Sequence, residues 1–321
     1  MCGRFCCSLN PEELKSRLYK ENVLKHKNVS WIDETKHRAS YNVCPARYIA
    51  TVFQSSEIDN ERIMKSMQWG YIPSWAKAAP PAKPINARVE TLTENPNSVF
   101  NASKNSRRCV IVAEGFFEWN KKRQAFYIER KDKKLMLFAG LYSNSHFNDD
   151  DLTTCTIITT HASSFFSKIH DRMPVILDES DIGIWLDKNQ PWDQRVTGLL
   201  KPFEGLLHCF QVTDKVGPIK NDYPELIVPI DKQKNSISQF LKPMDLKTEM
   251  QKDLPEPAVK KEAASGSNSN DSFTDTASPP KATKKRRHSS DQANKNNSKK
   301  ADETHATKAP KITQFFSKGK K

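Results

Sequence analysis

The hydrophobic and polar positions divide the chain into a long patterned part and a polar tail. Short runs of β-branched and aromatic residues recur between polar turns, which is the pattern of strands. We predict strands at residues 48–53, 108–113, 135–142, 153–160, 206–213 and 226–230.

Helices are predicted at three places. The first begins in NPEELKSRLYKENVL, where Asn10 is placed as the N-cap, Pro11 lies in the first turn and Glu13 follows three residues after the cap. A second covers residues 180–186, and a third begins near Trp192. Strands outnumber helices and do not alternate with them as βαβ units. This predicts an α+β fold with a mostly antiparallel, barrel-like sheet and a few peripheral helices.

The polar tail accounts for the unusual composition. The apolar share of the whole chain is 36% and its mean hydropathy is -0.72. All six Trp and seven Tyr precede residue 224, and the aromatic residues beyond residue 243 are Phe273, Phe315 and Phe316. We therefore predict a folded domain over residues 2–240 and a disordered tail over 241–321.

Charge is also unevenly distributed. Residues 251–321 hold 16 Lys and Arg against 8 Asp and Glu, which is +8 of the total +13, and +5 is left for the rest. A basic chain favours a polyanion as partner. The sequence has neither the apolar run of a membrane span nor the apolar segment of a signal peptide, so we expect a soluble, intracellular protein that does not contact membranes. We also expect a monomer.

Two short segments of the tail predict where the protein goes. The basic cluster KATKKRRH at 281–288 predicts nuclear import, although such a run can also be an ordinary solvated segment. In KITQFFSK, one helical turn would present Ile312, Phe315 and Phe316 together to a partner groove.

The seven cysteines include no C-x-x-C pair and no histidines at zinc-finger spacing, so we expect no metal, no cofactor and no disulfide framework. Cys109, Cys155 and Cys209 lie inside apolar runs and are predicted to be inert. Cys2 follows only the initiator Met. Once Met1 is removed, an α-amine and a thiol would stand on adjacent carbons, and this pair can close a thiazolidine ring on an aldehyde. The alternative is a cysteine without a role.

Three further segments contain candidate chemistry. In PINARVETL, alternation would place Asn86, Arg88 and Glu90 on one face of an extended segment, where an Arg and an amide suit a phosphate and a sugar or base; an ordinary surface loop is equally compatible. In VIVAEGFFEWN, the aromatic neighbours of Glu118 favour a general acid and base, and Glu114 competes for this role. In IHDRMPVIL, His170 could move protons, tuned by the adjacent Asp or Arg, or could be structural.

The order of these motifs resembles one family. MCGRF, YNVCPA, WGYIPSWA, INARVET, GFFEW and IHDRMPVIL follow one another as in the SOS response-associated peptidase-like (SRAP) proteins. The chain resembles the eukaryotic members, the abasic-site processing proteins, and the resemblance covers nearly all of residues 2 to about 235. Tyr71 stands where Leu is usual and Phe117 where Tyr is common.

The resemblance implies an enzyme that senses abasic sites in single-stranded DNA. The nucleophile would be Cys2, forming a thiazolidine crosslink that shields the lesion. Asn86 would position Cys2 or the sugar, Glu118 would shuttle protons, and His170 would assist opening of the sugar ring. The implied DNA contacts are Arg4 and Arg88 with phosphates and Trp69 and Trp75 with bases.

The resemblance also implies self-processing to remove Met1, autocatalytic or by an aminopeptidase, and reversal of the crosslink. It implies a location at replication forks in the nucleus. It also implies a clamp-binding (PCNA) box over residues 312–316; Ala309, three residues before this box, replaces the usual Gln. Two other functions stay open. The protein could be a cysteine peptidase or amidohydrolase, or a non-covalent reader of modified bases.

Overall fold

The computed structural model describes residues 2–56, 61–147 and 150–233. The chain divides into two units, Met1–Met250 and Gln251–Lys321, and the second lies outside the described residues. The basic cluster at 281–288 and the box at 312–316 therefore stay predictions, as does the domain boundary at residue 240. No helix among the described residues is long and apolar enough to cross a membrane.

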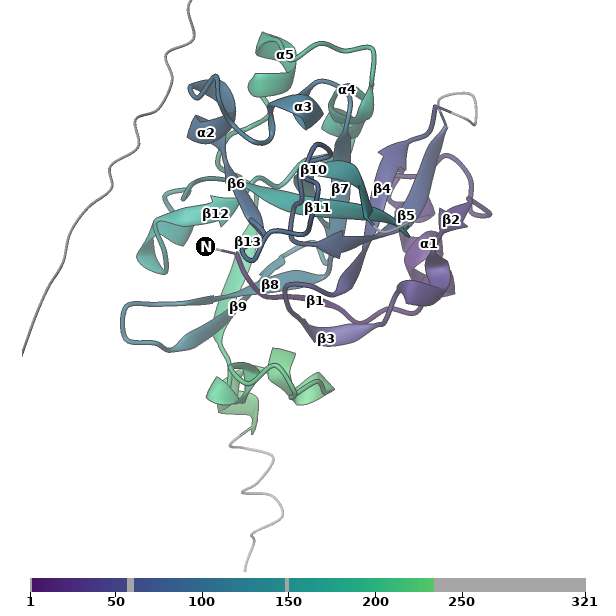
Figure 1. Ribbon diagram of the computed structural model, residues 1–321. Coiled ribbons are helices and arrows are strands. Elements are labelled where there is room, and N and C mark those ends of the chain that lie inside the picture. The colour runs from purple at the N-terminus through teal and green to yellow at the C-terminus, as the bar shows by residue number, and fades with distance from the viewer. Residues whose placement is uncertain (1, 57–60, 148–149, 234–321) are drawn as a thin grey trace, which may run out of the picture. The chain divides into compact units, whose positions relative to one another are not determined.

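A closed barrel is the centre of the first unit (Figure 1). Its strands are β4 (Tyr48–Gln54), β5 (Arg62–Trp69), β7 (Arg108–Ala113), β10 (Met136–Phe147) and β11 (Asp150–His161), in the order β11-β10-β7-β4-β5. The neighbouring pairs along this order are antiparallel. A parallel pairing of β11 with β5 closes the ring. Every residue of β7 is buried, because this strand faces the barrel interior on one side and other elements on the second.

Three shorter strands extend the barrel sheet: β2 (Trp31–Ile32), β6 (Asn86–Arg88) and β12 (Arg172–Pro174). β2 pairs with β5, while β6 and β12 both pair with β11. Segments far apart in the sequence, INAR and HDRMP, are in this way placed along one strand.

A second sheet lies against the barrel. Its order is β13-β9-β8-β1-β3, formed by β1 (Phe5–Cys7), β3 (Ser40–Val43), β8 (Gly115–Trp119), β9 (Ala125–Arg130) and β13 (Leu207–Gln211). The N-terminal strand β1 is inside this sheet, between β8 and β3. In Figure 1, β8 and β9 form a hairpin that extends past the N-terminus.

Helices are short and peripheral. They are α1 (Pro11–Lys20), α2 (Val89–Thr93), α3 (Asn101–Lys104), α4 (Ile182–Leu186) and α5 (Gln194–Thr197), with 3₁₀ turns η1 (Glu34–Lys36), η2 (Phe166–Lys168), η3 (Glu179–Asp181), η4 (Asp214–Val216) and η5 (Pro224–Ile227). α1 begins with the predicted capping box, in which Asn10 accepts from the Glu13 backbone and Glu13 accepts from the Asn10 backbone. Figure 1 shows α2 to α5 gathered at one end of the barrel.

The predicted fold class is confirmed, and two local predictions are wrong. Residues 226–230 do not form a strand, because Pro224 opens the 3₁₀ turn η5 there. The extended face proposed for Asn86, Arg88 and Glu90 ends at Arg88, since Glu90 lies in α2.

Candidate active site around Cys2

The first strand fixes the position of Cys2. Phe5 pairs with Phe116 of β8, and the Phe117 N–H donates to the Arg4 carbonyl at 2.9 Å. The Phe5 ring packs against Trp69, with centroids 5.2 Å apart. These contacts anchor the segment on both sides, and Cys2 is 0% exposed.

Two predicted residues reach Cys2 from different sheets. Asn86, at the start of β6, donates from Nδ2 to the Cys2 carbonyl oxygen at 3.0 Å. Glu118, from β8, lies close enough for its negative charge to act on the Cys2 thiol. We call Cys2, Asn86 and Glu118 the reaction centre.

The thiol of Cys2 is held in its protonated form. Burial raises its pKa far above the ordinary value, and the charge of Glu118 raises it further. The N-terminal amino group and a backbone hydrogen bond at Arg4 act in the opposite direction. A thiol in this setting needs a neighbouring base to react, and Glu118 is the carboxylate that acts on it.

Glu118 itself is buried, with 5% of its surface exposed. Its Oε1 accepts a hydrogen bond from the Trp119 N–H at 3.2 Å. Its competitor Glu114 has a structural task instead, because Oε2 accepts from the Ser8 hydroxyl at 2.8 Å and the Ser8 N–H at 2.5 Å, which fastens the end of β1.

His170 is positioned by its own loop between η2 and β12. Its Nδ1 lies 3.0 Å from the Arg172 N–H, which donates to it, and 2.9 Å from Asp171 Oδ1. The nitrogen serves one of these partners at a time: the neutral ring accepts from Arg172 and keeps its proton on Nε2, whereas the imidazolium donates to Asp171. The loop thus provides a partner for each protonation state.

Sequence reasoning missed an ion pair between α2 and β12. Arg172 donates from its two terminal nitrogens to the two carboxylate oxygens of Glu90, at 2.6 and 3.0 Å, and also to the Thr159 carbonyl. His161 Nε2 lies 2.9 Å from the same carboxylate. Hydrogen bonds from Arg172 lower the pKa of Glu90 to about 2. The partners are 82 positions apart, so no local pattern could have found this pair.

The four residues predicted to contact DNA have different surroundings. Arg88 is exposed, and no ion pair holds it within the described part of the chain. Arg4 donates to the Asn42 side chain and to the carbonyls of Val216 and Gly217, so its guanidinium ties the N-terminal segment to η4. Burial lowers the pKa of Arg4.

Trp69 and Trp75 come from the same motif but lie in opposite environments. Trp75 is 68% exposed and accessible to a base. Trp69 is 0% exposed, packs on Phe5 and donates its indole N–H to the Ile85 carbonyl at 2.9 Å. The predicted contact of Trp69 with DNA bases is therefore wrong, because its ring is part of the core.

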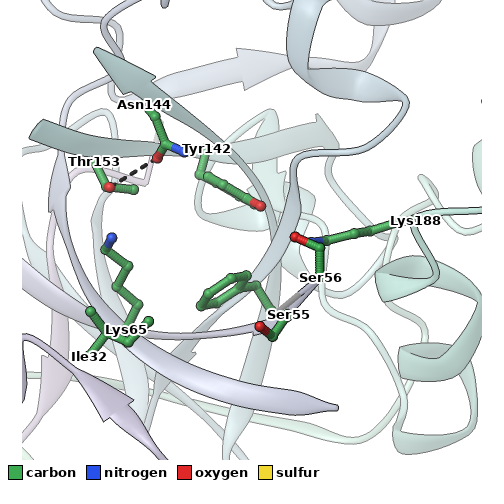
Figure 2. Close-up of a pocket in the computed structure, with 9 residues that line it drawn as sticks. Ile32, Ser55, Ser56, Lys65, Tyr142, Asn144, Thr153 and Lys188 are labelled. Atoms are coloured by element: carbon green, nitrogen blue, oxygen red, sulfur yellow. Dashed lines mark hydrogen bonds between the residues drawn. The ribbon is translucent and has the colours of Figure 1, made fainter. Parts of the chain in front are cut away.

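Two hollows in the surface differ in whether a predicted site residue lines them. A partly open cavity of about 160 Å³ is lined by Lys65, Tyr142, Lys188 and others, as Figure 2 shows. None of the predicted site residues lines it. A groove of about 420 Å³ does include His170, together with the turn after β8 and the η2 segment.

Together the fold and these contacts define a class of protein that buries a cysteine next to its N-terminus beside an amide and a carboxylate. A family model described as SOS response associated peptidase (SRAP) matches residues 1–219. The chain therefore belongs to the SRAP family.

Several relatives share the description "abasic site processing protein". "Abasic site processing protein YoqW" of Bacillus subtilis is 36% identical over 71% of this chain and 99% of its own length. "Abasic site processing protein HMCES" of Gallus gallus is 31% identical over 72% of this chain and 78% of its own length. "Abasic site processing protein YMR114C" of Saccharomyces cerevisiae is 31% identical over 73% of this chain and 69% of its own length.

A solved structure shares the fold. A crystal structure of a protein from Bacteroides thetaiotaomicron has a TM-score of 0.59 and 21% identity, covering 71% of this chain and 99% of that one. At that identity the likeness shows the fold alone.

Proposed function

We propose that this protein captures abasic sites in single-stranded DNA by forming a thiazolidine crosslink through Cys2 after removal of Met1. The observation that supports it best is the reaction centre itself: a buried thiol next to the N-terminus, held by an amide and influenced by a carboxylate. The names of the relatives agree with a substrate of this kind.

Removal of Met1 would create the reactive pair. Asn86 holds the Cys2 carbonyl through Nδ2, while its Oδ1 is buried and has no hydrogen-bond partner among the described residues. The new α-amine of Cys2 is a donor that could satisfy such an acceptor. Asn86 would then orient the amine as well as the carbonyl. Whether the protein removes Met1 itself or an aminopeptidase does so, the free amine is the same.

The chemistry balances with the loss of one water. The ring-opened sugar presents an aldehyde, and the amine attacks it to give a carbinolamine. Departure of hydroxide, protonated as water, leaves an imine. The sulfur then bonds to the imine carbon, and its proton ends on the nitrogen, closing the five-membered ring.

Two side chains would move the protons of these steps. Glu118 acts on the thiol in the structure, so it is the group that would take the thiol proton and deliver protons to the leaving hydroxyl. The His170 imidazolium, stabilised by Asp171, would donate a proton to the sugar ring oxygen while the ring opens, and Glu118 would take the proton of the anomeric hydroxyl; reversal returns both protons. Arg88 and Trp75 would hold the flanking phosphate and base.

A cysteine peptidase is less compatible with the geometry. Such enzymes activate sulfur as a thiolate beside a positive imidazolium, which lowers the thiol pKa. Here a carboxylate and burial raise the pKa of Cys2. Condensation with an aldehyde begins with the amine and does not need a preformed thiolate.

The proposal is tested by incubating the protein with a single-stranded oligonucleotide that carries one abasic site and resolving the products on a denaturing gel. Wild type should give a heat-stable adduct and Cys2→Ser none. Cys209→Ser is the matched control, because this thiol is partly exposed and lies in β13, which pairs with β9 and not with the N-terminal strand β1. Inserting one Ala before Cys2 keeps the thiol but covers its amine, and should also abolish the adduct. An equally stable adduct in Cys2→Ser would mean that another nucleophile, such as a lysine, forms the bond, and would reject the proposal.

We propose that the tail directs the protein to its location and takes no part in the crosslinking reaction. The cluster at 281–288 would direct nuclear import, and Ile312, Phe315 and Phe316 would contact a sliding clamp. Removing residues 243–321 should leave crosslinking unchanged and weaken nuclear accumulation; loss of crosslinking would reject this division.

A further inference from the structure

The groove beside His170 is bounded by two basic segments. One wall is the turn between β8 and β9, with Lys121 and Lys122, and the other is the η2 segment, with Lys168. Ile169, His170 and Asp171 continue the lining from Lys168. The groove begins at Asn120, the residue that follows β8, and β8 is the strand that contains Glu118. We call these three lysines and the space between them the basic groove.

The turn is rigid although its lysines are exposed. Asn120 Oδ1 accepts from the Lys122 and Gln124 N–H groups, both at 3.0 Å, and Asn120 Nδ2 donates to the Gln124 side chain at 2.8 Å. Arg123 has φ 60, a left-handed conformation that closes the hairpin. The backbone therefore presents Lys121 and Lys122 in a fixed direction while the side chains stay free to adapt.

The charges of the groove are not neutralised from within. Lys121, Lys122 and Lys168 have no ion pair with any of the residues that the structure describes. At the opposite end of β9 the lysines do pair: Lys133 with Glu129 and Lys134 with Glu179. The one carboxylate in the groove, Asp171, lies against His170. A site that keeps three positive charges against one negative charge favours an anionic occupant.

The lining also indicates which part of that occupant it contacts. Ile169 is the only apolar residue among those that line the groove, which otherwise presents amides, a hydroxyl, ammonium groups, the His170 imidazole and the Asp171 carboxylate. Apart from the His170 ring, such a surface offers no platform for base stacking, whereas it suits phosphates and sugars.

We propose that the basic groove binds the phosphate backbone of the DNA strand on one side of the abasic site. This rests on the proposed function, because the reaction centre sets where the lesion lies. The groove then gives the strand a direction: the nucleotides on one flank enter it, and those on the other flank do not.

The test separates the two flanks. Two oligonucleotides contain tetrahydrofuran, an abasic analogue without an aldehyde, either at the 5′ end or at the 3′ end of eight nucleotides, so binding is measured without crosslinking. Full-length protein is compared with a Lys121→Ala, Lys122→Ala, Lys168→Ala variant. A Lys20→Ala, Lys25→Ala, Lys201→Ala variant is the matched control, since these lysines are also exposed.

Three lost phosphate contacts should lower the slope of log affinity against log salt by about 2 for single-stranded DNA. Between 50 and 200 mM salt, wild-type affinity should then fall about 20-fold more than that of the variant. The change is expected with only one of the two oligonucleotides, and a Lys→Arg triple variant should restore it. Equal effects on both oligonucleotides, or none on either, would overturn the proposal. Because the analogue cannot react, these results are independent of whether wild type crosslinks a true abasic site.

Discussion

The reaction centre and the basic groove are constructed in opposite ways. Cys2 and Glu118 are almost completely buried, and Asn86 is hydrogen-bonded to Cys2. Lys121, Lys122 and Lys168 are exposed on a turn and a 3₁₀ segment. Bond formation requires atoms held in one geometry, whereas a phosphate backbone can be held by mobile charges. Substitutions in the reaction centre should therefore change the rate of crosslinking, and substitutions in the groove should change the salt-dependent affinity for DNA.

The largest expected effect is on the rate of crosslinking. Glu118→Gln keeps the shape of the side chain but removes the base beside the thiol, and should slow the crosslink by about 10²- to 10⁴-fold. Single-turnover kinetics on a denaturing gel measure this. Glu114→Gln is the control, because Glu114 fastens Ser8 and should alter stability more than rate. Equal slowing in both variants would contradict the assignment of Glu118.

Trp69 and Trp75 belong to one motif, but their substitution should have opposite effects on stability and DNA binding. Trp69→Ala should lower the free energy of unfolding by about 3–5 kcal/mol, because a buried ring is lost. Trp75→Ala should change it by less than about 0.5 kcal/mol. Trp75→Ala should instead weaken DNA binding by about 1–3 kcal/mol if the ring stacks on a base. Denaturant unfolding and DNA titration separate the two effects, and unchanged DNA affinity would remove Trp75 from the interface.

Asn86 should have an intermediate effect. Asn86→Ala removes the hydrogen bond to the Cys2 carbonyl and should slow crosslinking by about 10-fold or more, corresponding to about 1–3 kcal/mol. Asn101→Ala is the control: it removes a comparable hydrogen bond, from Asn101 in α3 to the Pro96 carbonyl, and should leave the rate unchanged. A rate that is unaffected by Asn86→Ala would show that the nucleophile does not need this contact.

The smallest effect concerns stability and pH at the Glu90–Arg172 pair. The pKa of Glu90 is lowered from 4.5 to about 2, so its contribution to stability is complete above about pH 4.5 and is lost as pH falls towards 2. The thermal midpoint of wild type should exceed that of Glu90→Gln at neutral pH, and the gap should close over this window. A gap that is constant from pH 7 to pH 2 would mean that the carboxylate charge is not what stabilises the pair.

Local patterns in the sequence were sufficient for much of the fold. Asn10, Pro11 and Glu13 predicted α1, and β-branched runs predicted β4, β7, β10 and β11, because capping and alternation depend on neighbours in the chain. The same reasoning failed at residues 226–230, where apolar residues fill a 3₁₀ turn against the core.

Contacts between distant segments could not be predicted in this way. Trp69 looked like a DNA contact because its motif is rich in tryptophan, but its environment is set by Phe5 from another sheet. Arg172 looked like a partner of His170, and its main partner is Glu90 in α2. Cys2 was recognised from the chemistry of a first residue, while its burial depends on β1 lying inside a sheet.

The most direct test of the proposed chemistry is to locate the bond. After wild-type protein reacts with an abasic oligonucleotide, trypsin and nuclease digestion should yield the peptide Cys2–Gly3–Arg4 with the residual sugar attached and a mass lower by one water than the sum of its parts. This result is predicted with Met1 absent from the peptide. Sugar attached to a lysine, or to a peptide that still contains Met1, would contradict a thiazolidine at Cys2.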